Sequence, residues 1–447
     1  METALDSGLT AWMLVSASFV LLMTPGLALF YGGMVRTKSV LNMMMMSFGA
    51  MAVVGVVYVL WGWSMSYGSD SVAGLFGSPV TNFGLADTIT DANGDFVIDG
   101  GLPVVVDVGF QATFAIITVA LISGAIADRA RFGTWMIFSA LWVTFAYFPM
   151  AHMVWGGGLL GGDGPFTSIA EPIDFAGGTV VHINAGAAAL VLAIIVGRRQ
   201  GFGTVAMRPH NLPLVMLGAA LLWFGWFGFN GGSAYGADGV AGLAWVNTTT
   251  ATCAATLGWL AVERIRDGHP TSLGAASGVV AGLVAITPAA GSVSPVGSIA
   301  LGALAGAFCA SAVGLKFRLG FDDSLDVVGV HLVAGLWGTV AIGFLATDTG
   351  LLYGGGFAQL AVQVIIAVVA VAFSVMVTAV IGLALAVTMG WRISEDDESA
   401  GIDATAHAES GYDFGGLGAP RSTAFRGASS SVPASAADAV NTSEVRS

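Results

Sequence analysis

The sequence predicts an all-α polytopic membrane protein with eleven transmembrane helices, of which ten form a five-plus-five inverted repeat and the eleventh is long and tilted. Of its 447 residues, 55% are hydrophobic and only 10% are charged, whereas soluble domains carry about a quarter charged residues. A mean hydropathy of +0.82 over this length places most of the chain in a bilayer. The third observation is that the basic residues fall only in alternate connections between apolar runs.

Eleven apolar runs, each of about 20 residues, have the length that crosses about 30 Å of hydrocarbon. They are apolar on all sides, with Gly and Ala interspersed, unlike the amphipathic helices of a soluble bundle. The runs cover residues 11–33, 42–63, 105–127, 133–153, 176–196, 213–230, 240–262, 272–288, 296–315, 327–346 and 357–390. The first lacks the basic start and cleavage site of a signal peptide and is expected to stay in the mature protein. The last is too long for a perpendicular span, which predicts a tilted or protruding helix.

The basic residues predict the orientation of the chain. Every Lys and Arg follows an odd-numbered run, and the alternate connections contain none. The fifteen residues are Arg36, Lys38, Arg129, Arg131, Arg198, Arg199, Arg208, Arg264, Arg266, Lys316, Arg318, Arg392, Arg421, Arg426 and Arg446. By the positive-inside rule the side that holds them is cytoplasmic. The N-terminus is therefore expected outside the cell membrane and the C-terminus inside.

The chain divides into a membrane domain, residues 1–390, a cytoplasmic segment, residues 391–414, and an Ala/Ser/Gly-rich stretch, residues 415–447, whose composition predicts disorder. An external loop at 64–104 contains DANGDFVIDG, which has an Asp-x-Asn-x-Asp spacing. It lacks the glutamate that closes an EF-hand, so an acidic turn is the favoured interpretation. Cys253 and Cys309 fall within apolar runs and predict no external disulfide.

Two histidines stand out because they lie inside apolar runs. VVHINAG contains His182 and GVHLVAG contains His331, and in each motif an Ala-Gly pair follows three and four residues after the histidine. Because each half of the repeat has an odd number of helices, the second half would be inverted in the membrane. Such repeats place a site near the midplane, on the pseudo-two-fold axis. The two histidines are therefore expected to come close together.

Ionisable groups inside membrane spans are costly and usually mark a pathway. This favours a functional pair over the alternative, in which each histidine is a core residue bonded to a backbone carbonyl. A neutral imidazole offers one donor and one acceptor, so two rings can share a proton and line a narrow path. Two histidines without a third His or carboxylate make a poor zinc site. No metal, no cofactor, no nucleic-acid partner and no enzymatic activity are expected.

Five motifs resemble the ammonium transporter (Amt/Mep/Rh) family, and its bacterial and archaeal Amt branch most of all. They are GFQATFA (109–115), MVWGGG (153–158), DFAGGTVVHINAG (174–186), WFGFNGGSA (226–234) and DVVGVHLVAG (326–335). The resemblance extends from about residue 10 to about residue 412. It implies eleven helices in a lipid bilayer with the N-terminus outside, a homotrimer with one pore per subunit, and uptake of ammonium.

The resemblance also assigns roles to matching positions. It places Trp155, Phe110 and Ser233 at an external recruitment site, where an aromatic face stabilises a partly desolvated cation by up to about 2 kcal/mol and a hydroxyl accepts an N–H bond. Phe114 and Phe229 match a stacked pair that closes the pore below this site. Without the family, Trp155 would be an interfacial aromatic residue and the two phenylalanines ordinary helix packing.

Two aspartates stand at the start of the histidine-bearing runs. Asp174 opens the fifth run, where the simple interpretation is an N-cap. The resemblance adds that its charge lowers the cost of a cation at the mouth of the path. Asp326 stands at the start of the tenth run on the cytoplasmic side and is predicted to be a structural cap rather than a ligand.

The expected mechanism follows from the cost of desolvating a charge. A bare cation in a narrow apolar lumen lined by His182 and His331 is heavily penalised, whereas neutral ammonia is not. Ammonium is therefore expected to be recruited outside and deprotonated at or just below the recruitment site, and ammonia to pass the two histidines. Potassium has no proton to lose and is excluded. Whether the proton follows along the histidines, which would make transport electrogenic, stays open.

The cytoplasmic segment offers a partner and a rival function. GIDATAHAESGYDF (401–414) resembles the family's region that contacts neighbouring subunits and docks PII-type signalling proteins; a solvated acidic tail is the alternative. An ammonium sensor that signals through this segment is the main alternative function. Sensors usually carry an added enzymatic or kinase domain, and this segment is too short to form one.

Three further readings are weaker. A secondary transporter for another solute would normally need an ion-coupling carboxylate in mid-span, and the apolar runs offer none. An Rh-like gas channel is disfavoured by Trp155 in its Amt-type context. ATP-driven pumping is disfavoured because no Gly-x-x-x-x-Gly-Lys-Ser/Thr motif occurs.

Overall fold

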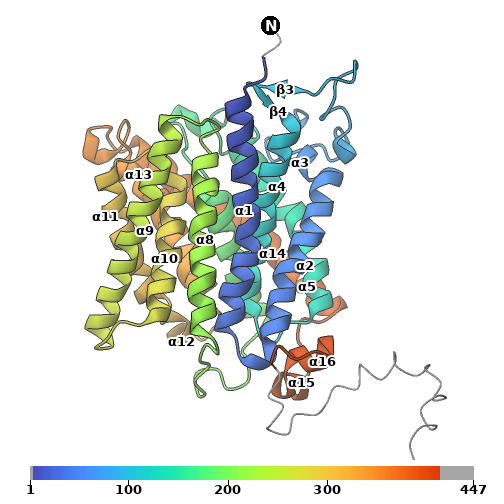
Figure 1. Cartoon of the computed structure of the whole chain (residues 1–447), viewed down its shortest axis with the longest axis vertical. Coiled ribbons are helices and arrows are strands. Elements are labelled where there is room, and N and C mark those ends of the chain that lie inside the picture. The colour runs from blue at the N-terminus through green and yellow to red at the C-terminus, as the bar shows by residue number, and fades with distance from the viewer. Residues whose placement is uncertain (1–3, 413–447) are drawn as a thin grey trace, which may run out of the picture.

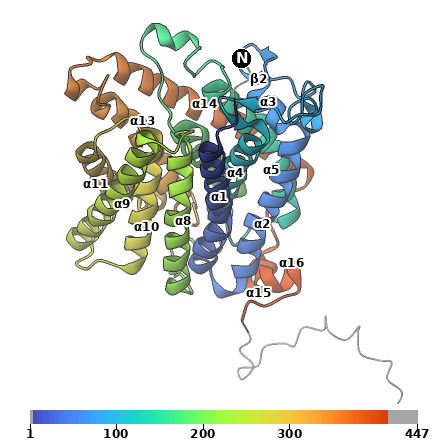
Figure 2. The same ribbon diagram turned by 45° about the horizontal axis from the view of Figure 1, so that its top comes forward.

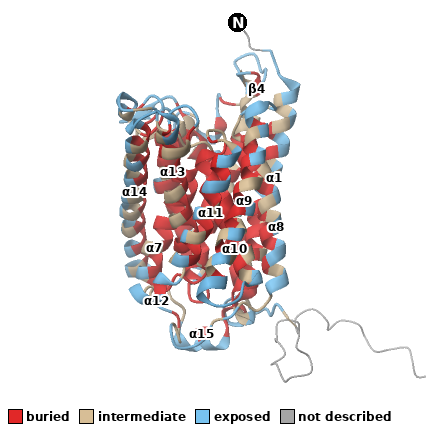
Figure 3. Cartoon of the chain, turned by 90° about the vertical axis from the view of Figure 1, so that its left-hand side faces the viewer, coloured by how far each residue is buried: buried red, intermediate tan, exposed pale blue. Residues whose placement is uncertain are grey.

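Long apolar helices dominate the structure, a computed structural model that describes residues 4–412. They run side by side along one direction, with loops gathered at the two ends (Figure 1). Buried residues occupy the centre of the bundle from end to end, and exposed residues cover its ends and parts of its outer faces (Figure 3). The outer faces are themselves apolar: α14 alone exposes Val368, Val380 and Val387. An apolar exterior suits contact with lipid rather than water.

Ten helical segments within residues 4–412 are long and apolar enough to cross a membrane. They are α1 (Ser7–Met34); η1 (Thr37–Ser39), α2 (Val40–Val57), η2 (Tyr58–Gly62) and α3 (Trp63–Tyr67) in series; α4 (Val104–Ile122) with η4 (Ser123–Ile126); α5 (Phe132–Trp142), η5 (Val143–Tyr147) and α6 (Phe148–Trp155); η7 (Gly178–Ile183) with α7 (Asn184–Val196); α8 (Leu212–Gly232); α10 (Ser272–Ile286) with η8 (Thr287–Ala289); α11 (Pro295–Ala312) with α12 (Leu315–Leu319); η9 (Val328–Leu332) with α13 (Val333–Leu345); and α14 (Ala358–Thr388). Ten of the eleven predicted runs are thus matched.

The remaining predicted run, 240–262, is also helical but more polar. It forms α9 (Gly239–Arg266), which packs between α10 and α11 (Figure 2). Asn and Thr residues lower its hydropathy, and the buried Asn247 bonds across the bundle: its amide donates to the carbonyl oxygens of Ala290 and Val293, both at 2.8 Å. Its polar groups therefore serve packing between helices.

The predicted long last helix is observed. α14 has 31 residues, which at 1.5 Å per residue is about 46 Å, well beyond the thickness of the hydrocarbon. It is followed by two short helices, α15 (Glu395–Ala400) and α16 (Ile402–His407). These lie at the end of the bundle opposite the N-terminus (Figure 1).

The loop between α3 and α4 contains two small antiparallel hairpins. β1 (Ser71–Val72) pairs with β2 (Phe76–Gly77), and β3 (Ile98–Asp99) pairs with β4 (Leu102–Pro103). Between them, the Asp91 carboxylate accepts hydrogen bonds from the backbone N–H groups of Asn93 and Asp95 at 2.8 and 3.0 Å. It closes a turn, as the acidic-turn interpretation predicts. Three short 3₁₀ turns complete the loops: η3 (Phe83–Leu85), η6 (Pro165–Ser168) and η10 (Leu351–Tyr353).

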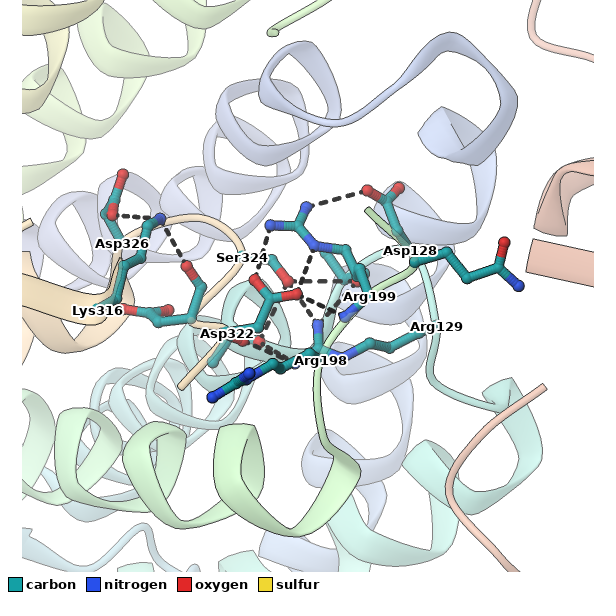
Figure 4. A network of polar contacts seen from close by, with 12 residues as sticks. Asp128, Arg129, Arg198, Arg199, Lys316, Asp322, Ser324 and Asp326 are labelled. Atoms are coloured by element: carbon teal, nitrogen blue, oxygen red, sulfur yellow. Dashed lines mark hydrogen bonds and ion pairs between the residues drawn. The ribbon is translucent and has the colours of Figure 1, made fainter. Parts of the chain in front are cut away.

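A network of charges ties together the loops at the end that holds α15 and α16. Arg199 bonds Asp322 through two nitrogens at 2.8 and 2.9 Å and reaches Asp128 at 3.2 Å (Figure 4). Burial alone would raise the pKa of Asp322, but the hydrogen bonds and charge of Arg199 outweigh it and hold that pKa below its usual range. The fully buried Arg129 donates to backbone carbonyls, among them that of Asp322 at 2.7 Å. Loops far apart in sequence are thus fixed to one another.

The segment after α14 packs onto this network. Glu398, which is buried, accepts from the backbone N–H of Gln200 at 2.8 Å and from Arg392 at 2.7 Å. Asp403 accepts from the backbone N–H groups of Leu41 and Asn42. Residues 391–412 are therefore anchored to the bundle through Glu398 and Asp403, while acidic residues such as Glu395 and Asp396 stay exposed. The end of the predicted cytoplasmic segment, 413–414, and the stretch 415–447 with its predicted disorder lie outside the described residues.

Candidate functional site

His182 and His331 meet where the two helices that carry them cross. Their Nδ1 atoms are 3.3 Å apart, and the rings are nearly parallel, with 20° between planes and 5.4 Å between centroids. Both are buried, with 1% and 3% of their surfaces exposed. Each lies in a π-helical turn, η7 or η9, a rare distortion that is frequent at functional sites. The structure brings together the pair that the sequence motif singles out.

The crossing depends on one glycine from each helix, four residues after each histidine. A Cβ at Gly186 would lie 2.5 Å from the backbone nitrogen of Leu332, and a Cβ at Gly335 would lie 3.1 Å from Cβ of His182 and 3.2 Å from the nitrogen of Ile183. The contacts are reciprocal, because each glycine meets the other histidine's neighbourhood. Larger residues would separate the two imidazoles.

Asp174 caps the helix that carries His182. Its Oδ1 accepts from the backbone N–H groups of Gly177 and Gly178 at 2.8 and 2.6 Å, and its Oδ2 accepts from the N–H and the hydroxyl of Thr179. The N-cap interpretation is therefore confirmed. Because both oxygens are occupied by the chain itself, Asp174 acts on the site through its charge and through the geometry of the helix start.

The prediction that Asp326 caps the helix that carries His331 is wrong. Asp323 does so: its two oxygens accept from the backbone N–H groups of Val327 and Val328 at 3.0 and 2.8 Å. Asp326 has a left-handed backbone, with φ of +62°, and its side chain instead bonds Lys316 Nζ at 2.7 Å. Burial raises the pKa of Asp323 to about 6, and the charge of Lys316 acts in the opposite direction.

The sequence contained a signal for Asp323. Asp174 precedes His182 by eight residues, and Asp323 precedes His331 by the same number. Matching the two motifs over a longer stretch would have identified the cap.

An outer cavity of about 470 Å³ lies beside Trp155 and Asp174. The indole N–H of Trp155 donates to the backbone oxygen of Asp174 at 2.9 Å, which fixes the ring. Ser233 also lines this cavity, and its hydroxyl donates to the backbone oxygen of Phe229 at 2.8 Å. The lone pairs of that hydroxyl are left to accept a hydrogen bond from a molecule in the cavity.

Phe110, the remaining member of the predicted recruitment set, is placed differently. Its side chain is fully buried and packs edge-on against Phe114, with centroids 4.9 Å apart. It is not among the residues that line the outer cavity. Phe110 supports the wall of the cavity from behind, so its face is not presented to a cation there.

Phe114 and Phe229 form the predicted stacked pair. Their centroids are 4.1 Å apart and their planes are 27° apart. Phe114 lines the outer cavity and Phe229 lines an inner one, so the stack lies between the two. Phe229 and Trp226 in turn stack near His182, at 6.2 and 5.6 Å between centroids.

The inner cavity is small and apolar. Its volume of about 10 Å³ is close to the least that holds one water-sized molecule. It is lined by Met23, Leu27, Phe30, Ile117, Leu121, Val181, His182, Leu222, Trp226, Phe229, Val280 and His331. The Trp226 N–H is already bonded to Thr287 at 2.8 Å, whereas Nε2 of His182 has no partner among the described residues. The imidazoles are therefore the groups that can bond a molecule in this cavity.

Sequence reasoning missed five polar residues of the outer cavity: Tyr67, Asp107, Gln111, Glu171 and Tyr235. Gln111 lies in the middle of the GFQATFA motif, and Asp107 is in the first turn of the same helix, α4. A polar residue within an apolar run was the signal, the same one that singled out the histidines. Within residues 4–412 no cluster of three or more His, Cys, Asp or Glu side chains could hold a metal ion.

The bundle of long apolar helices, with two cavities separated by a pair of stacked rings, is that of a multi-pass membrane protein. Residues 11–412 match the family model described as the Ammonium Transporter Family. The chain belongs to this family.

Relatives span most of the chain. The Ammonium transporter of Mycobacterium bovis is 55% identical over 434 residues, covering 92% of this chain and 91% of that one. Amt1 of Archaeoglobus fulgidus is 41% identical and covers 91% and 100%. Among solved structures, Candida albicans Mep2 gives a TM-score of 0.79 at 32% identity, covering 88% of both chains. A structure titled Sensor Amt Protein gives 0.81 at 28% identity, covering 89% and 98%.

Proposed function

We propose that this chain takes up ammonium across the cell membrane by recruiting the cation in the outer cavity, removing a proton, and passing ammonia through the inner cavity beside His182 and His331. The observation that carries the proposal is the inner cavity itself. It is apolar, has a volume of about 10 Å³, and is lined by two imidazoles whose Nδ1 atoms are 3.3 Å apart. Relatives named as ammonium transporters at 41–55% identity support the choice of cargo.

The size and polarity of the inner cavity favour a neutral passenger. A hydrated cation cannot enter so small a volume without losing its water, and an apolar wall returns little of that hydration energy. Ammonia is about as large as water and can bond an imidazole nitrogen as donor or acceptor. The proton must then be released above the histidines, at or near the stacked pair Phe114 and Phe229. Its acceptor is either water in the outer cavity or, if the proton follows the ammonia, the two histidines.

In the outer cavity, recruitment rests on Trp155, Ser233 and Asp174. The indole face attracts a cation, the Ser233 oxygen accepts an N–H bond, and the Asp174 charge lowers the potential at the mouth. Phe110 contributes by holding Phe114 in place.

We further propose eleven membrane crossings with the N-terminus outside. α9 joins the ten apolar segments, and an odd number of crossings agrees with the N-terminus and α16 lying at opposite ends of the bundle. The fifteen basic residues then lie on the cytoplasmic side. The equal spacing of Asp174–His182 and Asp323–His331 and the reciprocal glycine contacts support the five-plus-five inverted repeat.

A homotrimer and the docking of a PII-type protein on residues 391–412 remain proposals that rest on the family resemblance. The likeness to a structure titled Sensor Amt Protein favours one second candidate, a sensor that signals through this segment. The two candidates differ in flux, because a sensor would bind ammonium without carrying much of it.

The test is transport by the purified chain in proteoliposomes with ammonium and potassium gradients. Saturable ammonium flux with no potassium flux is expected, and a charge moved with each ammonium would show that the proton follows. Ammonium binding without flux would favour the sensor.

A further inference from the structure

Three residues on one wall of the outer cavity form a hydrogen-bonded chain that the proposed recruitment site does not use. The Tyr235 hydroxyl donates to Oδ1 of Asp107 at 2.6 Å, and the Gln111 amide nitrogen donates to the Tyr235 hydroxyl oxygen at 2.6 Å. All three side chains line the cavity together with Trp155 and Ser233. Asp107 and Gln111 lie one turn apart on α4, and Tyr235 comes from the loop after α8.

The direction of these two hydrogen bonds follows from the chemistry of Asp107. An ionised carboxylate can only accept hydrogen bonds, and the phenol of tyrosine has one hydrogen to donate. Tyr235 gives that hydrogen to Asp107, so its oxygen can only accept from Gln111. The amide of Gln111 must therefore turn its NH₂ group toward Tyr235 and its carbonyl oxygen, Oε1, away.

Gln111 is only 6% exposed, and Oε1 finds no hydrogen-bond donor among the described residues. A buried acceptor without a donor is unfavourable, and most such groups in proteins are satisfied. Oε1 is closed to solvent in this structure. Because Gln111 lines the cavity, a shift of its side chain toward the cavity would let an N–H donor there bond Oε1 and remove this cost.

Tyr235, in the middle of these hydrogen bonds, has an unfavourable backbone conformation. Tyr235 has φ of +49°, in the left-handed region that is unfavourable for a residue with a Cβ. Its ring packs edge-on against Phe110, with centroids 5.9 Å apart and planes at 88°. Phe110 and the strained turn thus fix the hydroxyl between Asp107 and Gln111.

We infer that Gln111 is a further cation-binding residue of the outer cavity, whose Oε1 accepts a hydrogen bond from ammonium, and that Asp107, acting through Tyr235, is the positioning residue that aims this oxygen. The inference rests on the proposed function. It gives the bound cation a second oxygen acceptor besides the hydroxyl of Ser233, and it links affinity to a carboxylate that does not touch the cation.

The test measures the ammonium concentration that gives half-maximal uptake in proteoliposomes at pH 7.5. Gln111→Met has nearly the same shape and no acceptor, so it should raise this concentration about tenfold while the maximal rate stays within about twofold. Tyr235→Phe keeps Gln111 but removes the hydroxyl that orients its amide. It should raise the half-saturating ammonium concentration by less than Gln111→Met does.

Asp107→Asn tests the direction of the chain. Its new NH₂ group can donate to Tyr235, whose hydroxyl is then free to donate to Oε1 of Gln111. The Gln111 amide would flip and present its hydrogens to the cation, so the half-saturating concentration should rise at least as much as in Gln111→Met. Asp107→Glu, which keeps an acceptor, should recover part of the loss.

A double-mutant cycle separates the effect of Asp107 on the orientation of the Gln111 amide from the effect of its negative charge. Adding Asp107→Asn to Gln111→Met should have little further effect, because no oxygen remains to be aimed. Glu171 is an exposed residue of the same cavity, and its side chain is not bonded to Asp107, Tyr235 or Gln111. The effect of Glu171→Gln, which removes a charge, should therefore add to that of Gln111→Met.

The inference would be overturned if Gln111→Met kept the half-saturating ammonium concentration of the unmodified protein. It would also be overturned if the effects of Asp107→Asn and Gln111→Met were fully additive. If the unmodified chain shows no saturable ammonium flux at all, the proposed function fails instead. Equal thermal midpoints of the variants in detergent establish that each is folded.

Discussion

His182 and His331 have different surroundings although they occupy matching positions. His182 stacks on Trp226, with centroids 5.6 Å apart and planes 15° apart. It lines the inner cavity, and its Nε2 has no hydrogen-bond partner among the described residues. Within the described residues, the ring contact recorded for His331 is the one with His182. His182 is thus held by aromatic faces on one side and by an imidazole on the other, which leaves its nitrogens as the polar groups of the path.

Replacing His182 with alanine should abolish selective transport or degrade it at least tenfold, because the cavity loses its hydrogen-bonding nitrogens and gains room for water and ions. Ammonium and potassium currents in proteoliposomes measure both effects. His152→Gln is the matched control. His152 is also buried, but its two nitrogens are bonded to Ser66 O and Ser71 Oγ at 3.1 and 2.8 Å. This change should affect stability more than selectivity. Unaltered ammonium currents with potassium still excluded in His182→Ala would refute the role of the pair.

The reassigned cap leads to a stability prediction. Asp323→Ala removes the acceptor of two backbone N–H groups and should lower the free energy of unfolding by about 1–2 kcal/mol. Asp326→Ala removes only a partly exposed ion pair with Lys316 and should cost less than about 1 kcal/mol. Thermal unfolding in detergent compares the two. A larger loss for Asp326→Ala would restore the original assignment.

The pH dependence of Asp323 follows from its raised pKa of about 6, against about 3.9 for an unfolded chain. Between these values the folded state holds the proton more tightly than the unfolded state, so the contribution of Asp323 to stability falls as pH rises from about 4 to about 6. As pH rises across this window, the thermal midpoint of the unmodified protein should therefore fall relative to that of Asp323→Asn. A difference that is constant with pH would contradict the assignment.

Individual residues differ in how far the sequence could predict them. His182 and His331 could be found because an ionisable ring in an apolar run is conspicuous. Asp323 was missed because Asp326 is nearer to the apolar run, and only its left-handed backbone turns it away. The aim of Gln111 depends on Tyr235, 124 residues distant, and no local pattern contains it.

At the scale of elements, the crossing of the two histidine-bearing helices is set by close backbone approach. Gly186 and Gly335 replace side chains at the points of contact, so the spacing of the imidazoles is a property of the helix pair. Small residues at helix contacts are how membrane bundles pack tightly.

Gly186→Ala should destabilise the bundle by about 1–3 kcal/mol, the usual effect of overpacking, and lower flux by moving the histidines apart. The control is Gly242→Ala in α9, where a Cβ would meet nothing within 4 Å. That change should be neutral or stabilising by up to about 1 kcal/mol. Thermal midpoints and ammonium flux are measured for both, and equal effects would show that the crossing tolerates a side chain.

Hydrophobic runs predicted the helices well, but not their local form. Ten of the eleven runs match apolar helical segments, and the boundaries agree to within a few residues. The π-helical turns η2, η5, η7 and η9 could not be foreseen, because a run that is apolar on all sides has no stripe from which the helical period can be read. Two of these turns carry the histidines.

For the whole molecule, the charge network at one end is the main polar tie between distant loops. Asp322, Arg199 and Asp128 are nearly fully buried, whereas most other charges face solvent. A buried pair loses much more than an exposed one when a single partner is removed, because the other charge is left without compensation.

Asp322→Asn should therefore lower the free energy of unfolding by about 3–5 kcal/mol. Asp267→Asn is the control, because Asp267 pairs with Arg266 while both side chains are about half exposed, at 45% and 46%, and an exposed ion pair contributes little to stability. Chemical or thermal unfolding in mild detergent gives the comparison. Similar losses in the two variants would mean that the network does not stabilise the loops.

The size of the inner cavity has a consequence for throughput. If cargo takes the proposed route, a cavity with room for about one small molecule makes passage single file, and each molecule must leave its position before the next can occupy it. Water would have to queue for the same position, so inward movement of one species obstructs outward movement of the other. The ceiling on turnover is then the dwell time at one spot beside the paired rings, and crowding more cargo at the entrance cannot raise it.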